Sequence, residues 1–137
     1  MEINPSSSAS GGLRRASKFY KYQKNMVIKN IRINSEAIKF IIEKDGKVAG
    51  RAYLYLIYND LHSEPYGFLE DVFIEESYRG QGIGGELVKA VIEEAKELGC
   101  YKLIGTSRNS RTEVHEFYKK LGFEDYGKEF RIDLRVG

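Results

Sequence analysis

The sequence predicts an α+β domain built on a mixed, mostly antiparallel sheet with one β-α-β crossover. Two observations support this fold class. Strand-like runs joined by short polar breaks fill the middle of the chain, and one strong helical pattern lies between two such runs. The length of 137 residues suits a single folding unit. We therefore expect one domain over residues 13–137, preceded by a small, polar, flexible arm over residues 1–12.

The first elements are expected between residues 13 and 58. A weak helical stripe predicts a short helix followed by a strand over Met26–Ile33; the stripe consists of Leu13, Ala16, Tyr20 and Lys24. Strand-like runs over Ala37–Glu43 and Val48–Tyr58 flank Lys44–Lys47. Asp45-Gly46 in that break can supply the positive φ angles of a tight turn, so the two runs are predicted to form a hairpin.

The strongest periodic pattern predicts a long helix between two strands, over Tyr66–Ile74 and Tyr101–Thr106. Its apolar stripe ends at Gly99 and consists of Ile83, Leu87, Val88, Val91, Ile92, Ala95 and Leu98. This strand–helix–strand order predicts the crossover.

The last third of the chain predicts a second helix and a strand pair. Ser110–Glu113 has the pattern of a capping box that opens a helix, and Gly122 ends it. Phe123–Tyr126 and the alternating run Phe130–Val136 are expected to pair around a turn at Gly127.

The composition excludes several classes of protein. The 22 Lys and Arg residues nearly balance the 20 Asp and Glu residues, so the charge does not indicate a nucleic-acid partner. Cys100 is the sole cysteine, which rules out an intrachain disulfide and favours a reducing, cytoplasmic location. No apolar run approaches the roughly 18 residues of a membrane span, so no membrane partner is expected. One Cys and two His are too few for a zinc cage, and no metal site is predicted.

Four glycines gather in Arg79–Gly85, between a predicted strand and the long predicted helix. Glycine lets the main chain approach a ligand without interference from a Cβ atom. The first amides of a helix have no partner within it, and a helix start carries about half a positive charge. Such a loop is typical of a phosphate or pyrophosphate site, and the alternative is a glycine-rich connection without a ligand.

The run Gly80-x-Gly82-x-x-Gly85 also fits the fingerprint of dinucleotide-binding oxidoreductases. Two features oppose that interpretation. Glu75–Arg79 separate the predicted strand from the first glycine, and Cys100–Ser110, where the ribose-binding acid is expected, contains no Asp or Glu. The lysine of a P-loop is absent as well, because Glu86 follows the last glycine. A dinucleotide-binding oxidoreductase therefore remains a less favoured alternative.

Read from Arg79, the loop has the pattern R-x-x-G-x-G, and with the preceding Leu69–Ile74 it resembles the GNAT superfamily of acetyl-CoA-dependent N-acetyltransferases. A second segment, His115–Phe123, is similar to the later helix of that family and its terminal Gly-Phe. The two matches lie within Tyr66–Tyr126. The resemblance implies an acyl-CoA N-acyltransferase type of fold, an α/β/α sandwich-like arrangement, and direct acetyl transfer from acetyl-CoA to a primary amine without a metal.

The resemblance also implies roles for individual residues. Main-chain groups of Val72, Phe73 and Ile74 would bind the pantetheine arm. Arg79 would open the pyrophosphate loop, whose amides come from Gly80, Gln81, Gly82, Ile83, Gly84 and Gly85. Tyr118 falls on the tyrosine that the family uses as a general acid toward the departing thiolate. The alternatives are core packing for the strand residues and Tyr118, and a solvated charge for Arg79.

An amine acceptor must lose a proton before it attacks, which requires a base or a water chain. Glu70 and Asp71 lie on the strand beside the expected thioester, and strand alternation would send them to opposite faces. We assign Glu70 as the candidate base; the alternative is an edge carboxylate paired with a lysine. His115, one turn before Tyr118, is expected to be a half-exposed helix residue.

The sequence leaves the acceptor open between small-molecule and peptide amines. Leu98–Ile104, with Leu69–Val72, resembles the glucosamine-phosphate acetyltransferases of the superfamily. The helical pair that the family places between its first two strands has no counterpart between Ile33 and Ala37. We therefore expect an open acceptor side, or one completed by residues 13–25 or by a second subunit in a homodimer. A shortened acceptor side also fits an acyl-CoA-binding protein without turnover.

Overall fold

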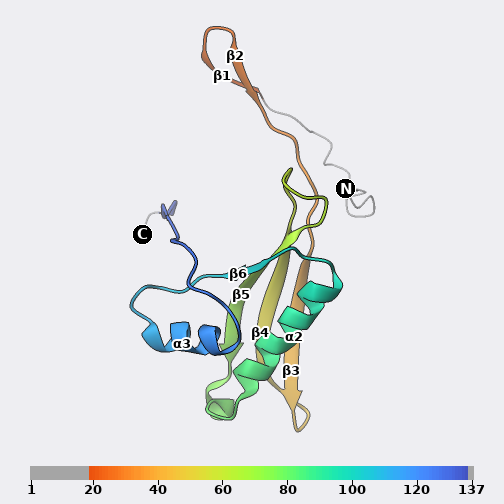
Figure 1. Cartoon of the computed structure of the whole chain (residues 1–137), viewed down its shortest axis with the longest axis vertical. Coiled ribbons are helices and arrows are strands. Elements are labelled where there is room, and N and C mark those ends of the chain that lie inside the picture. The colour runs from red at the N-terminus through yellow and green to blue at the C-terminus, as the bar shows by residue number, and fades with distance from the viewer. Residues whose placement is uncertain (1–18, 136–137) are drawn as a thin grey trace.

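The computed structural model describes residues 19–135, and Figure 1 shows their arrangement. A two-stranded hairpin comes first, made of β1 (Phe19–Gln23) and β2 (Met26–Lys29). The main sheet follows in the order β3-β4-β5-β6. Its strands are β3 (Ala37–Lys44), β4 (Lys47–Ile57), β5 (Tyr66–Ile74) and β6 (Leu103–Gly105). A short 3-10 helix, η2 (Glu76–Tyr78), precedes α2 (Ile83–Glu97), and α3 (Thr112–Lys120) follows β6.

The sheet confirms the predicted fold class. β3, β4 and β5 are antiparallel neighbours, while β5 and β6 are parallel and are joined by the crossover through α2. The predicted hairpin turn is also confirmed, because Asp45 and Gly46 have φ angles of 53° and 77°. Two positive φ angles in succession match the right-handed twist of the flanking strands.

The core lies between α2 and one face of the sheet (Figure 1). Its largest fully buried side chains are Leu54 of β4, Leu69 of β5, and Val88 and Val91 of α2. The helical residues come from the predicted apolar stripe, so burying that stripe is what holds α2 on the sheet. α3 lies beside the β5–β6 end of the sheet, and its Phe117 and Tyr118 pack against the same core.

Both helices end on the predicted glycines. Gly99 and Gly122 have φ angles of 77° and 104°, which favour glycine. After α2, the amide of Gly99 donates to Lys96 and that of Cys100 to Ala95, both at 3.0 Å. The amides of Gly122 and Phe123 repeat this pattern after α3. These are the two hydrogen bonds of a Schellman motif, which satisfies carbonyl groups that the helix leaves without partners.

The predicted capping box is wrong. α3 begins one residue later than the box requires, with Arg111 as its N-cap, and no side chain caps it. The amides of Val114 and His115 donate instead to the main-chain oxygen of Arg111, at 3.0 and 3.2 Å. The turn Asn109–Ser110 precedes this N-cap, so Ser110 lies outside the position from which its hydroxyl would cap the helix.

The predicted first helix is wrong within the described residues, because the chain runs as β1 from Phe19. Asn25, with a φ angle of 62°, turns the chain into β2, and this local turn overrides the weak helical stripe. β2 is also shorter than the predicted strand. This hairpin stands apart from the main sheet in Figure 1. The predicted arm over residues 1–12 lies outside the described residues.

The predicted strand pair near the carboxyl terminus is wrong over the described part, up to Arg135. Residues 123–135 form neither strand nor helix. Tyr126, Phe130 and Leu134 are between 89% and 93% exposed. Alternating apolar residues form a strand only where a neighbouring strand takes their main-chain hydrogen bonds. β6, shorter than the predicted Tyr101–Thr106, extends over three residues only.

Candidate functional site: an open helix start beside a divided sheet

α2 begins without a side-chain cap. Its N-cap is Gly82, with a φ angle of 79°, and Gly80 has the same angle. The main-chain oxygen of Gly82 receives the amide of Glu86 at 3.2 Å, which is the first bond of the helix ladder. The preceding amides, those of Ile83, Gly84 and Gly85, therefore have no acceptor within the helix. We call these three amides, together with the preceding loop Gly80–Gly82, the helix mouth.

The helix mouth is open on one side and packed on the other. A Cβ atom added to Gly80, Gly82 or Gly85 would meet nothing within 4 Å. One added to Gly84 would lie 3.6 Å from Ile74 of β5 and 3.8 Å from Phe117 of α3. A phosphate group suits such a place, because unpaired amides and the helix dipole both favour an anion.

The sheet divides next to the helix mouth. The pairing of β5 with β6 ends at Leu69 and Gly105, so the second half of β5 has no pairing with β6. The amide of Glu75 donates to Ala49 at 2.8 Å and therefore points toward β4. Main-chain groups of successive residues in a strand point to opposite sides. The amide and carbonyl groups of Val72 and Ile74 therefore point away from β4, toward the side on which β5 has no pairing with β6. Of the three residues predicted to bind pantetheine, Val72 and Ile74 have main-chain groups facing that opening, whereas Phe73 pairs with Arg51 and its main chain faces β4.

Arg79 and Phe73 lie at the end of the half of β5 that has no pairing with β6. The Nε atom of Arg79 donates to the main-chain oxygen of Ile74 at 2.8 Å. The Arg79 guanidinium also lies 5.5 Å from the ring centre of Phe73, and that of Arg51 lies 4.7 Å from it. Arg79 is therefore anchored at the strand end through Nε, while its side chain remains exposed.

A β-bulge lies at the point of division. The register between β4 and β5 shifts between Arg51 and Tyr53, and Asp71 has a φ angle of 51°. Glu70 is opposite Tyr53, while Asp71 forms an ion pair of 2.8 Å with Arg51. Arg51 and Tyr53 are two residues apart on β4 and share a face. The expectation that Glu70 and Asp71 face opposite sides is therefore wrong, because the bulge breaks the alternation.

Its neighbours hold the carboxyl group of Asp71 in the ionised form. The hydrogen bond from Arg51 lowers the pKa of Asp71, and the nearby charges of Arg51 and Lys39 add to this effect. A carboxylate held ionised in this way is a weak proton acceptor. The ion pair is exposed, so its role is to orient Arg51 and Asp71 more than to stabilise the fold.

Tyr118 sits in an aromatic cluster at the end of α3. Its ring centre lies 5.5 Å from that of Phe117 and 5.2 Å from that of Phe123. Burial raises the pKa of Tyr118, the carboxylate of Glu70 raises it further, and Arg111 opposes both effects. The phenol is therefore protonated at neutral pH and lies within electrostatic range of Glu70.

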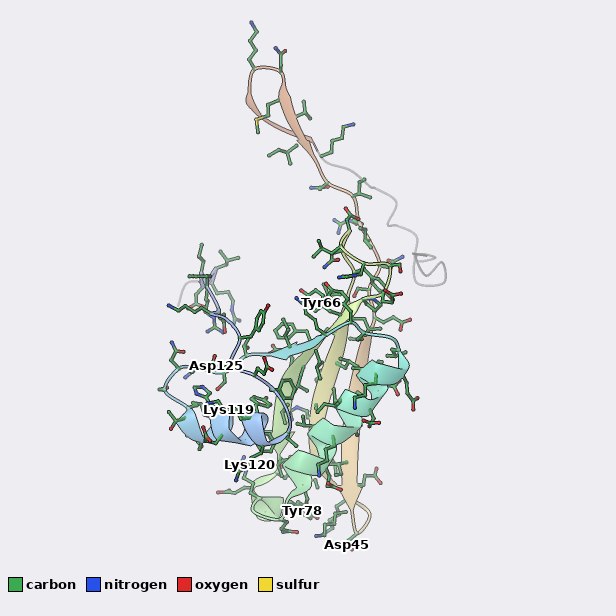
Figure 2. All side chains as sticks on the ribbon, in the orientation of Figure 1. Asp45, Tyr66, Tyr78, Lys119, Lys120 and Asp125 are labelled. Carbon is green, nitrogen blue, oxygen red and sulfur yellow. The ribbon has the colours of Figure 1, made fainter. Side chains whose placement is uncertain are left out.

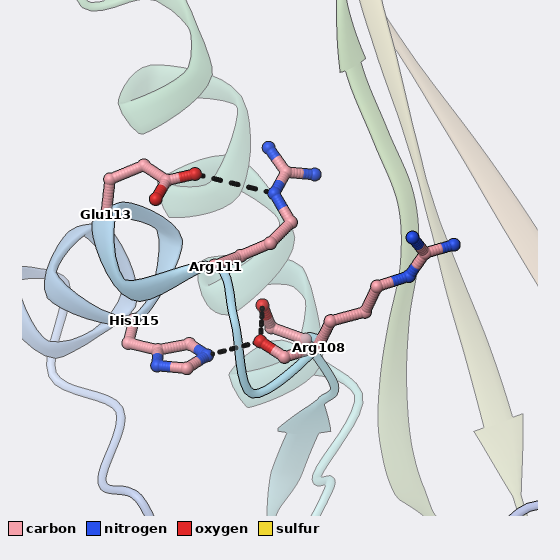
Figure 3. Close-up of polar contacts among 5 residues, drawn as sticks. Arg108, Arg111, Glu113 and His115 are labelled. Carbon is pink, nitrogen blue, oxygen red and sulfur yellow. Dashed lines mark hydrogen bonds and ion pairs between the residues drawn. The ribbon is translucent and has the colours of Figure 1, made fainter.

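His115 fastens the loop before α3, as Figure 3 shows. Its Nε2 atom lies 2.9 Å from the main-chain oxygen of Arg108. In the same view Arg111 pairs with Glu113 at 3.4 Å. His115 thus has a structural partner, consistent with the half-exposed helix residue expected from the sequence.

One cation at the helix mouth was missed by the sequence analysis. Lys44, at the end of β3, donates from Nζ to Oε1 of Gln81 at 2.7 Å. The two residues are 37 positions apart, so local spacing carries no signal for this contact. Only the placement of the β3–β4 turn beside α2 brings them together.

The described residues also bear on three other kinds of feature: a metal site, a membrane span and a reactive thiol. Within residues 19–135, His, Cys, Asp and Glu side chains form no group of three that would hold a metal ion. No helix of that region is long and apolar enough to cross a membrane. Burial raises the pKa of the Cys100 thiol, which packs against the core and is therefore less reactive than a free thiol.

An open, glycine-lined helix start beside a divided sheet is the kind of site that suits a phosphate group. The family model of the acetyltransferase (GNAT) family matches residues 11–123, and the chain belongs to that family. This confirms the resemblance found in the sequence.

Individual proteins show the same relationship. A glucosamine 6-phosphate N-acetyltransferase of Trypanosoma brucei brucei is 33% identical over 96 residues, which cover 69% of this chain and 63% of that protein. A solved putative acetyltransferase of Agrobacterium tumefaciens has a TM-score of 0.68 at 32% identity, covering 71% of this chain and 68% of that one. An aminoglycoside N-acetyltransferase in complex with CoA has a TM-score of 0.60 at 27% identity, covering 72% and 75%. The chain thus spans less than two thirds of the curated relative.

Proposed function

We propose that the protein transfers an acetyl group from acetyl-CoA to the primary amine of a small molecule. The observation that carries this proposal is the helix mouth, with three amides unpaired in the helix and open space beside Gly85. Its position next to the divided sheet supports binding of a diphosphate and an attached arm together. The family and the CoA complex of a structural neighbour support the same ligand.

The residues of the mouth would hold the diphosphate of the coenzyme. Amides from Gly80 to Gly85 would donate to its oxygens, helped by the dipole of α2. The outward-facing main-chain groups of Val72 and the amide of Ile74, whose carbonyl already accepts from Arg79, would pair with the amides of the pantetheine arm. Arg79, fixed at the end of β5, would border the same channel.

Two side chains would move protons. Tyr118 would donate its phenolic proton to the departing thiolate, since burial and Glu70 keep it protonated. Glu70 would accept the proton of the amine, directly or through water. It suits this role better than Asp71, whose carboxylate is bound to Arg51. An amide near Ile74 would stabilise the oxyanion that forms on attack.

We infer that the acceptor is an amino sugar. Two of the three relatives described above are named for glucosamine 6-phosphate and for aminoglycosides, both of which carry sugar amines. The sheet face beside Glu70 offers Tyr53 and Tyr55, whose rings stack at 5.9 Å. Aromatic rings next to a carboxylate suit a sugar ring that bears an ammonium group. A peptide amine is the alternative acceptor.

The direct test measures thiol release from acetyl-CoA over a panel of amino sugars, aminoglycosides, diamines and peptides. We expect release with an amino sugar and none without an acceptor. Binding of CoA without release from any amine would favour an acyl-CoA-binding protein instead. Binding of NADH in a parallel titration, without binding of CoA, would favour the dinucleotide-binding alternative.

A further inference from the structure

The charges around the helix mouth do not by themselves favour a polyanion. Between Glu75 and Glu86 the chain carries three carboxylates, at positions 75, 76 and 86, and a single cation, Arg79. Arg79 directs its Nε atom to Ile74 and lies over the ring of Phe73. Three carboxylates against one cation leave this segment net negative, so a further cation near the loop would favour a ligand with several phosphate charges.

Lys44 is placed to supply that charge. The β3–β4 turn and η2 lie at the same end of the molecule, as the labels Asp45 and Tyr78 in Figure 2 show. The ammonium group of Lys44 donates to the Gln81 side chain at 2.7 Å. Gln81 itself stands between Gly80 and Gly82, which both have a φ angle of 79°. Lys44 thus contacts the side chain of Gln81, the residue in the middle of the glycine loop.

The contact leaves the charge of Lys44 available. An ammonium group has three donors, and the bond to Gln81 uses one of them. The Gln81 oxygen is uncharged, so it positions the ammonium group without neutralising it. The lysine is held at its base by the tight turn, where Asp45 and Gly46 have positive φ angles. Lysine binds phosphate as a point charge and needs no fixed planar geometry.

We propose that Lys44 binds a phosphate of the coenzyme and is held for this purpose by Gln81. The proposal rests on the proposed function, because it takes the coenzyme as the ligand of the helix mouth. It adds a residue from a distant hairpin to the loop and helix amides. The phosphate in question is either the diphosphate or the 3′-phosphate of the ribose.

Calorimetric titration of the full chain with CoA and with dephospho-CoA, which lacks the 3′-phosphate, tests the proposal. Lys44→Met removes the charge and keeps most of the side chain. We expect it to weaken CoA binding about tenfold, the usual size of a charged hydrogen bond, and to reduce the dependence of affinity on ionic strength. Lys44→Arg should restore much of the affinity. Lys47→Met, across the same turn, is the matched control and should bind CoA as the unchanged protein does.

The pair of ligands separates the outcomes. An equal loss for both ligands assigns Lys44 to the diphosphate, and a loss for CoA alone assigns it to the 3′-phosphate. Unchanged affinity and unchanged salt dependence in a folded Lys44→Met variant would overturn the role of Lys44, while the proposed function would stand. If the unchanged protein bound neither ligand, both proposals would fall together.

Discussion

The two ends of α2 are built in opposite ways. At the carboxyl-terminal end, the amides of Gly99 and Cys100 satisfy two carbonyl groups of the last turn. At the amino-terminal end, no side chain caps the helix, and a Cβ atom at Gly85 would meet nothing within 4 Å. The hydrogen bonds at the carboxyl-terminal end stabilise the helix without occupying groups that a ligand would need. The amino-terminal end has glycine as its N-cap, which gives up only about a few tenths of a kcal/mol relative to a capping side chain and keeps the amides available to a ligand.

The largest effect is expected from a negative charge at the open end. Gly85→Asp places a carboxylate in the third helical position. The helix dipole favours a negative charge there, and a Cβ atom meets no steric conflict. We expect the fold to be retained and CoA affinity to fall at least about 100-fold, because the carboxylate caps the amides and repels phosphate. Gly85→Ala is the control and should keep most of the affinity. Titration of both variants with CoA measures the affinity, and melting curves check the fold. Equal CoA affinity in the two variants would contradict the assignment of the helix mouth as the phosphate site.

The second prediction concerns α3, whose Phe117 lies next to Gly84 at the open end of α2. Tyr118→Phe should lower kcat about 100-fold and leave CoA affinity nearly unchanged, because only the phenolic proton is lost. Tyr126→Phe is a suitable control, since Tyr126 is 93% exposed. Unchanged turnover of the Tyr118 variant in the thiol-release assay would exclude the acid role.

The third prediction compares a carboxylate near the open end with one at the closed end. Glu70→Gln should lower kcat about tenfold at neutral pH, because water replaces the base only in part. The deficit should shrink as the pH rises through the pKa of the acceptor amine, where more of the acceptor is already deprotonated. The raised pKa of Tyr118 keeps the acid protonated toward that range.

Glu97→Gln, in the last turn of α2, is the matched control for this pH profile and should follow the unchanged protein at every pH. A deficit of the Glu70 variant that stays constant from neutral to alkaline pH would argue against proton acceptance by Glu70. It would leave Glu70 as a residue that positions the acceptor or Tyr118.

The smallest effect is expected at the closed end. Gly99→Ala forces a Cβ atom into a φ angle of 77°, which costs about 1 kcal/mol of unfolding free energy. Its Cβ would lie 3.9 Å from Glu64, an ordinary contact, so no clash adds to this cost. CoA affinity should remain unchanged. Chemical denaturation measures the unfolding free energy, and titration of the same sample measures the CoA affinity. A loss of CoA affinity in this variant would contradict the proposed difference between the two ends of α2.

Local patterns predicted the closed end better than the open one. Gly99 and Gly122 end their helices as expected, because a helix end depends on the backbone freedom of a single residue. The apolar stripe of α2 and the Asp45-Gly46 turn are equally local. The glycine loop was recognised, but its open side follows from how α2 rests on the sheet, which no local pattern encodes.

The errors have tertiary causes. The bulge at Asp71 puts two neighbouring carboxylates on one face, whereas regular alternation separates them. The contact of Lys44 with Gln81 arises from two loops that meet in space. Phe130, Ile132 and Leu134 alternate as a strand would, yet the described chain provides no pairing for them. Periodicity indicates what a segment can form, and a neighbour decides whether it forms.

The central claim is that unpaired amides at the start of α2 bind the diphosphate of CoA. Titrating the ¹⁵N-labelled chain with CoA while recording amide shifts tests it directly. We predict that the largest shifts occur at Ile83, Gly84 and Gly85, with smaller ones at Val72 and Ile74 and none at Gly99. Shifts confined to other parts of the chain, with the amides of α2's first turn unchanged at saturating CoA, would contradict the account.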